Sequence, residues 1–266
     1  MQHLFQTWES FASAIRASAH VLLLSDYDGT LTPIAGRPQD ALLPDDVRTS
    51  LRALAERPAF SVGIISGRSL REVRAMVGVE GIYYAGNHGL EIEGPGLSFV
   101  HPAAEAARPL IRELASQLTA RLGEIQGVVI EDKGLTLSLH YRLVSADGEH
   151  VVVETFRRVT SPLLDSGKIR VTTGKKVLEV RPPIDWDKGK ALETIRIELE
   201  GLSGPGRLLT IYLGDDLTDE DAFKAIRRTG GWEVFVGKEN EASNADYFLS
   251  STLEVAAFLT ELARLK

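Results

Sequence analysis

The sequence predicts an α/β fold in which a parallel sheet core is interrupted by a smaller inserted lobe. Short, wholly apolar runs, each flanked by segments of helical spacing, indicate strands buried on both faces, as in a parallel sheet. The middle of the chain instead alternates apolar and polar residues, which is typical of antiparallel hairpins. With 266 residues, 44% of them hydrophobic, the chain can bury one large core or two modest ones.

The first part of the chain alternates strands and helices. An amphipathic opening segment comes first, and a helix is expected from Pro44 onward. Ser69 and Glu72 have the spacing of a capping box and predict the start of another helix. Strands are expected at 21–24, 60–65 and 82–85. This order predicts neighbouring parallel strands.

Residues 105–182 are predicted to form the inserted lobe, an α+β domain of two αββ units. The expected elements are helices 105–122 and 149–164, and strands 128–132, 135–141, 168–172 and 176–181. In strand 135–141 leucines alternate with polar residues, which predicts a sheet with one solvent-exposed face. The second hairpin is expected to turn at Gly174. Because two antiparallel hairpins do not continue a parallel sheet, we assign them to a separate lobe.

The α/β pattern resumes after Pro182 and Pro183. The expected elements are a helix at 187–199, a strand at 208–213, a helix after Thr218, a strand at 232–236 and a closing helix capped by Ser251 and Glu254. The core domain is therefore expected to comprise residues 1–104 and 183–266.

Bulk properties narrow the classes of partner. No stretch approaches the roughly 18 to 20 apolar residues that span a bilayer, and cysteine is absent. The formal net charge of -7 repels polyanions such as nucleic acid. We expect a soluble, cytoplasmic and monomeric protein that binds neither nucleic acid nor membrane.

Acidic residues follow the first buried strand. Asp26 and Asp28 are separated by one bulky residue, so both can face the crevice at the carboxyl edge of the sheet, where ligands of open α/β folds bind. Taken alone, the segment could be an acidic turn.

Three more chemical groups follow later strands or open a helix. Ser66 follows the strand 60–65, and Lys188 opens a helix, whose free N–H groups favour an anion. The carboxylates clustered after the strand 208–213 suit a hard cation, and they are Asp215, Asp216 and Asp219. Each group has a simple structural alternative, but four in this order at one sheet are specific.

The segment Asp-x-Asp-Gly-Thr-Leu-Thr-Pro resembles the first motif of the haloacid dehalogenase (HAD) superfamily, and the other three motifs follow in the expected order. The resemblance implies a HAD-like Rossmannoid core with an inserted cap, and a magnesium-dependent phosphatase. Asp26 would then be the nucleophile that forms an aspartyl phosphate, and Asp28 the general acid and base. Ser66 and Lys188 would hold the phosphoryl oxygens.

The same resemblance implies a metal site. Mg²⁺ would be bound by the Asp26 carboxylate, the Asp28 backbone carbonyl and Asp215. Asp216 and Asp219 are expected to act as outer ligands through water, and the sequence leaves open which of them is nearer.

Three further segments resemble trehalose-6-phosphate phosphatases, namely 86–89, 131–134 with 140–142, and 174–182. They imply hydrolysis of trehalose 6-phosphate to trehalose and inorganic phosphate, in trehalose biosynthesis. The substrate contacts implied are Arg68, Asn87, His88, Glu131, Lys133, Arg142, Lys176 and Glu179. From the residues alone, the charged pairs of the lobe could equally be cross-strand ion pairs, and His88 a core histidine.

Other classes of protein share part of this motif pattern. Another capped sugar phosphatase, acting on sucrose phosphate or mannosylphosphoglycerate, would share the core chemistry, and a phosphosugar mutase would transfer the phosphoryl group. A phospho-acceptor signalling domain accepts the phosphoryl group after its third strand and needs no inserted lobe. The position of Asp26 after the first core strand therefore argues against a signalling domain.

Overall fold

A computed structural model describes residues 1–203, 208–239 and 241–265. The chain divides into a larger unit, Met1–Phe99 with Trp186–Lys266, and a smaller unit, Val100–Asp185. The smaller unit begins before the expected residue 105 because its first helix, α4 (Pro102–Leu122), already starts with a proline, a favoured residue for the first helical turn.

The larger unit is built on a nine-stranded sheet in the order β1-β13-β12-β11-β2-β3-β4-β5-β6. Its strands are β1 (Gln2–His3), β2 (His20–Ser25), β3 (Phe60–Ile65), β4 (Tyr83–Gly86), β5 (Glu91–Gly94), β6 (Leu97–Val100), β11 (Leu208–Gly214), β12 (Gly231–Val236) and β13 (Tyr247–Leu249). The pairs from β1 to β4 are parallel, and β5 runs antiparallel to β4. The predicted parallel α/β core is confirmed.

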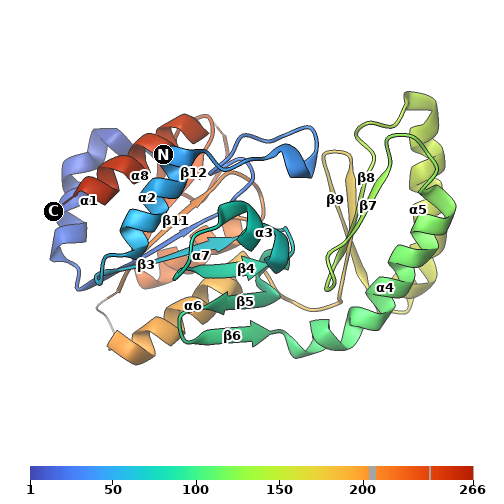
Figure 1. Ribbon diagram of the computed structural model, residues 1–266, viewed down its shortest axis with the longest axis horizontal. Helices are drawn as coiled ribbons and strands as arrows, with labels where there is room; N and C mark the ends of the chain where they lie inside the picture. The colour runs from blue at the N-terminus through green and yellow to red at the C-terminus, as the bar shows by residue number, and fades with distance from the viewer. Residues whose placement is uncertain (204–207, 240, 266) are drawn as a thin grey trace. The chain divides into compact units, whose positions relative to one another are not determined.

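Helices cover both faces of this sheet (Figure 1). The helices are α1 (Trp8–Ala17), α2 (Asp45–Ala55), α3 (Leu70–Val77), α6 (Lys188–Ser203), α7 (Glu220–Thr229) and α8 (Thr252–Arg264). Val21 and Leu23 of β2 pack in one core with α1, α2, α3 and α8, whereas Leu22 and Leu24 pack in a second core with α6 and α7. Alternate residues of a strand point to opposite faces, so a wholly apolar strand serves both cores.

The local signals of the sequence agree with these elements. β3 has the predicted bounds, and α3 begins with the predicted capping box, in which Ser69 accepts a hydrogen bond from the Glu72 backbone. The sequence analysis assigned no strand to the regions of β1, β5, β6 and β13. These strands have at most four residues and lie at or next to the sheet edges, where burial imposes little periodicity.

The smaller unit carries a four-stranded antiparallel sheet in the order β7-β8-β10-β9. Its elements are α4, β7 (Val129–Asp132), β8 (Leu137–His140), α5 (Ala146–Asp165), β9 (Arg170–Gly174) and β10 (Val177–Arg181). Leucines of β8 form a core with α4 and α5. The second hairpin turns at Lys175 and Lys176, not at Gly174, because Gly174 still pairs with Val177.

The solvent-exposed face expected for the strand 135–141 is wrong at two positions, one just before β8 and one within it. Thr136 and Ser138 are 0% and 2% exposed. Ser138 pairs with Glu131 on one side and with Glu179 on the other. A short side chain in a central strand is therefore flanked by two longer ones, which lowers its exposure.

Candidate active site

Three predicted site residues follow the carboxyl ends of three adjacent strands. In the order β11-β2-β3, Leu213 is paired with Ser25, and Ser25 with Ile64. Asp215, Asp26 and Ser66 come directly after these paired strand ends. Asp26 and Ser66 are buried, at 5% and 1% exposure.

Lys188 joins two of the carboxylates. It opens α6, is 2% exposed, and donates from Nζ to Asp26 Oδ1 and to Asp219 Oδ1, both at 2.7 Å. Burial would lower the pKa of Lys188, but the Asp219 and Asp26 carboxylates outweigh it and raise that pKa. An ammonium has three N–H groups, so one remains for a further acceptor.

Asp219 is the centre of a hydrogen-bond network. Its Oδ1 accepts from Lys188 and from the hydroxyl of Tyr212 (2.6 Å), and its Oδ2 accepts from the backbone N–H groups of Asp215 (3.0 Å) and Asp216 (3.1 Å). The sequence analysis missed Tyr212, because a tyrosine inside an apolar strand looks like core packing. A polar hydroxyl three residues before the acidic cluster was the available signal.

Asp28 is held by Arg68. The guanidinium donates from Nε to Asp28 Oδ2 (2.6 Å) and from Nη2 to Asp28 Oδ1 (2.5 Å), and Nη2 also donates to the Pro38 carbonyl (2.8 Å). Such bidentate pairs are both strong and geometrically specific. Asp28 and Arg68 were predicted separately, as acid and substrate ligand, and the structure brings them together.

The carboxylates form a candidate cation site. One oxygen each of Asp26, Asp215 and Asp219 lies within 4.8 Å of the others. Burial and the neighbouring carboxylates raise the pKa of Asp26 well above its usual range, despite the opposing charge of Lys188. Burial, Asp219 and Asp216 raise the pKa of Asp215 to about 7. Three carboxylates facing one ammonium leave uncompensated negative charge, so the donor set fits a hard divalent cation.

Gly29 gives the chain room beside this site. Its φ is +92°, and a Cβ built there would lie 2.0 Å from Asp215 Oδ2. A side chain at this position would both strain the backbone and displace the carboxylate.

Asn87 and His88 form a strained turn between β4 and β5. Both have positive φ, 51° and 58°, which is uncommon for residues other than glycine. Asn87 is fully buried and its amide donates to Glu91 (2.7 Å), so in this conformation its side chain holds the turn together. The His88 ring lies against Gly67, where a Cβ would approach it to 2.8 Å.

A second group of predicted residues gathers on the sheet of the smaller unit. Lys133 Nζ lies 3.5 Å from Glu179 Oε1, and His140 Nε2 lies 3.0 Å from Glu131 Oε2. Glu131 and Glu179 flank Ser138 in the same cross-strand row. We call Glu131, Lys133 and Glu179 the charged row.

Lys176 and Arg142 have described contacts outside the charged row. Lys176 pairs with Glu149 of α5 and lies over the ring of Tyr141. Arg142 donates to the carbonyl of Lys175 (3.3 Å).

Residues 24–252 match the family model described as trehalose-phosphatase. This match spans most of the chain and includes the strand ends, the carboxylate cluster and the charged row. The chain belongs to the trehalose-phosphatase family. Membership favours a trehalose phosphate over the substrates of other capped sugar phosphatases, and hydrolysis over transfer by a mutase.

Similar sequences also come from trehalose-phosphate phosphatases. A probable trehalose-phosphate phosphatase of Arabidopsis thaliana is 38% identical, over 97% of this chain and 71% of its own length. A trehalose 6-phosphate phosphatase of Zea mays is also 38% identical, over 97% of this chain and 74% of its own. Both alignments cover nearly all of the present chain.

A solved structure shows the same fold. The carboxyl-terminal domain of a Candida albicans trehalose-6-phosphate phosphatase superposes with a TM-score of 0.79, at 24% identity and with 97% of each chain covered. The two chains therefore share the same fold.

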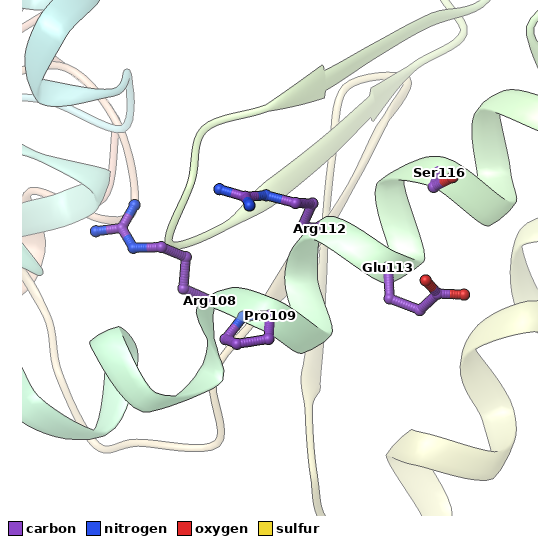
Figure 2. A pocket seen from close by; sticks show the side chains of 5 residues that line it. All are labelled: Arg108, Pro109, Arg112, Glu113 and Ser116. Atoms are coloured by element: carbon purple, nitrogen blue, oxygen red, sulfur yellow. The ribbon is translucent and has the colours of Figure 1, made fainter.

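One pocket lies on α4, and none of the predicted site residues lines it. It has a volume of 370 Å³ and is lined by Arg108, Pro109, Arg112, Glu113 and Ser116, all of them in α4 (Figure 2). Arg108 already donates two hydrogen bonds to Glu105, at 3.0 and 2.6 Å. The carboxylate of Glu105, which belongs to the same helix, thus compensates the positive charge of Arg108 at this pocket.

Proposed function

We propose that this chain hydrolyses trehalose 6-phosphate to trehalose and inorganic phosphate, with Asp26 as the covalent phosphoryl acceptor. The observation that carries the proposal is the position of Asp26. It directly follows β2, the central strand of the sheet, accepts a hydrogen bond from the Lys188 ammonium through Oδ1, and lies beside the Asp215 carboxylate. A buried carboxylate oriented by a cation is suited to attack on phosphorus.

A divalent cation, Mg²⁺, fits the carboxylates as cofactor. Asp26, Asp215 and the Asp28 backbone carbonyl would hold it directly. Asp219 would reach the cation only through water, because four donors already occupy its two oxygens. Asp216 is exposed, and among the described residues donors reach only its Oδ1, which leaves Oδ2 for a bridging water. The cation would offset the charge repulsion between Asp26 and the phosphate.

The reaction runs in two balanced steps. In the first, Asp26 attacks phosphorus, the bond from phosphorus to the sugar oxygen breaks, and Asp28 gives its proton to that oxygen. In the second, water attacks the aspartyl phosphate, Asp28 takes the proton, and phosphate leaves with Asp26 regenerated. The third N–H group of Lys188 and the Ser66 hydroxyl orient the phosphoryl oxygens.

Asp28 can act as the acid only if Arg68 first releases one of its oxygens. Asp28 cannot donate a proton while both of its oxygens accept hydrogen bonds from the guanidinium. A phosphate dianion is a competing acceptor for arginine. Arg68 therefore transfers part of its hydrogen bonding from Asp28 to the substrate phosphate, and Asp28 is then available as the acid.

The sugar is recognised by the charged row. Glu131 and Glu179 provide acceptors and Lys133 provides donors, which together match the mixed donor and acceptor character of sugar hydroxyls. Lys176, Arg142, Asn87 and His88 were also predicted as substrate ligands. Their contacts with Glu149, Lys175, Glu91 and Gly67 support a role in holding the turns of their own units.

Phosphate release over a panel of sugar phosphates tests the proposal. We expect trehalose 6-phosphate to be hydrolysed with the highest kcat/KM, with trehalose and free phosphate as products. Asp26→Asn should abolish turnover, because an amide of similar shape cannot attack phosphorus. Substantial phosphate release by a folded Asp26→Asn protein would remove Asp26 as nucleophile, and preference for another sugar phosphate would overturn the substrate.

A further inference from the structure

The Asp219 carboxylate connects the phosphoryl site to the interior of the larger sheet. Lys188 and Tyr212 share its Oδ1, at 2.7 and 2.6 Å, while two loop N–H groups hold its Oδ2. A carboxylate offers about four lone-pair sites, so these four donors use its full capacity. Any change in the position of Asp219 must therefore move the ammonium of Lys188 or break its contact.

Tyr212 is the donor that comes from a rigid element. It lies in the interior of β11, which pairs with β2 on one side and with β12 on the other. Its side chain is fully buried, and its ring packs edge-on against Phe223 at a centroid distance of 5.8 Å.

We infer that Tyr212 is a positioning residue for phosphoryl transfer. Its hydroxyl fixes Asp219 Oδ1, which in turn fixes the Lys188 ammonium against Asp26 Oδ1. The inference rests on the proposed function, because the ammonium has a chemical task only if Asp26 receives a phosphoryl group. Tyr212 acts through Asp219 and Lys188 and needs no contact with the substrate.

The Tyr212→Phe variant removes the hydroxyl and keeps the ring. Without it, Asp219 Oδ1 loses one of its two donors and the ammonium loses a fixed acceptor. We expect kcat to fall about tenfold, on the scale of one lost hydrogen bond to a charged group. KM should change little, because the sugar is bound elsewhere, and trehalose 6-phosphate and a small aryl phosphate should be affected equally.

Tyr84→Phe is the matched control. The hydroxyl of Tyr84 is also buried in the larger unit, where it donates to the Val79 carbonyl (2.6 Å) and accepts from the Val79 N–H (3.1 Å). Both variants should lower the melting temperature, but only Tyr212→Phe should lower kcat. A Tyr212→Phe protein with the kcat of the wild type would overturn the inference.

A double-mutant comparison separates positioning from a general structural effect. In an Asp219→Asn background, Tyr212→Phe should cost little further activity, because its influence passes through the Asp219 carboxylate. If the same loss persisted in that background, Tyr212 would act by another route and the inference would be wrong.

A crystal structure of Tyr212→Phe provides a readout that does not depend on turnover. We expect the Asp219 side chain to rotate and the Lys188 ammonium to move away from Asp26 Oδ1. Unchanged contacts of 2.7 Å from Lys188 to both carboxylates would contradict positioning by Tyr212. A wild-type protein that hydrolyses no phosphate ester would overturn the proposed function, and the crystal structure would still show separately whether Tyr212 positions the Lys188 ammonium.

Discussion

Asp28 illustrates how a residue's partner limits its chemistry. Asp26 and Asp28 lie two positions apart, yet Asp26 is bound by the buried Lys188 and Asp28 by Arg68. In the proposed mechanism Asp26 is the nucleophile, and Asp28 is held by a guanidinium that the substrate phosphate would attract. In that mechanism the same residue type serves two tasks, because Asp26 contacts an ammonium and Asp28 a bidentate guanidinium.

Replacement of Asp28 by Asn should affect the two half-reactions differently. Sugar alkoxide leaves slowly without a proton, so we expect turnover of trehalose 6-phosphate to fall about a hundredfold to ten-thousandfold. An activated aryl phosphate needs no protonated leaving group, so its first-turnover burst should survive while aspartyl phosphate accumulates. Rapid-quench measurement of the burst tests this prediction. Equal losses in the burst for both substrates would argue against Asp28 as the acid.

Cation binding should compete with protons at Asp215. Its pKa of about 7 lies above the ordinary value, so the folded, cation-free protein favours the protonated form and loses stability as pH rises through this range. A cation requires the carboxylate, so affinity for Mg²⁺ should rise about tenfold per pH unit below pH 7 for each proton displaced. Titration calorimetry in buffers of different ionisation enthalpy measures the released protons. An affinity independent of pH between about 5.5 and 7, or unaffected by Asp215→Asn, would contradict the site.

At the scale of elements, the hairpins of the smaller unit align three charged side chains. Register sets this alignment, because Glu131 and Glu179 both pair with Ser138 across neighbouring strands. A slip of one residue in either pairing would turn a carboxylate to the opposite face, which packs against α4 and α5. The antiparallel ladder therefore keeps the side chains of the charged row on one face.

Loss of a carboxylate from the charged row should lower activity on trehalose 6-phosphate but not on a small aryl phosphate. Glu131→Ala or Glu179→Ala should lower kcat/KM for trehalose 6-phosphate about tenfold or more, on the scale of about 1.5 to 3 kcal/mol per charged hydrogen bond. A small aryl phosphate offers no sugar hydroxyls, so its hydrolysis should change little. The matched control is Glu154→Ala, which removes an ion-paired carboxylate from α5 of the same unit. Equal losses on both substrates would mean that the row is structural.

At the scale of the whole molecule, the two units have separate hydrophobic cores. The core of the smaller unit joins both helices to β8 and β10 and draws its residues from between Ile111 and Val180. Within the described residues, no helix is long and apolar enough to cross a membrane. The excess of acidic residues, 37 against 30 basic ones, is consistent with a substrate drawn in by a local cation site.

The segment Val100–Asp185 should fold when expressed alone. It is continuous in sequence and contains a complete sheet, two helices and its own core. We expect a mixed α/β circular dichroism spectrum and a cooperative thermal transition. Leu139→Ala, at a fully buried position, should cost about 2 to 5 kcal/mol and abolish that transition. A disordered spectrum for the unmodified segment would contradict its independence.

The sequence by itself determined the α/β core, the strand at 60–65, the capping box of Ser69 and Glu72, and the order of the four chemical motifs. These features depend on local spacing. Strands buried on two faces must be wholly apolar, and parallel strands must end at a common edge, so chemical groups at strand ends can be recognised before any contact is known.

Only the tertiary structure decided which side chains meet. The pairing of Arg68 with Asp28, the sharing of Asp219 by Lys188 and Tyr212, and the separation of Lys176 from Glu179 depend on how strands and turns are stacked. Hydrophobic periodicity reports whether a position is buried, but it contains no information on the hydrogen-bond partner that a buried polar group finds across the sheet. Tyr212 therefore looks like a core residue in the sequence, although its hydroxyl reaches the carboxylate that holds Lys188.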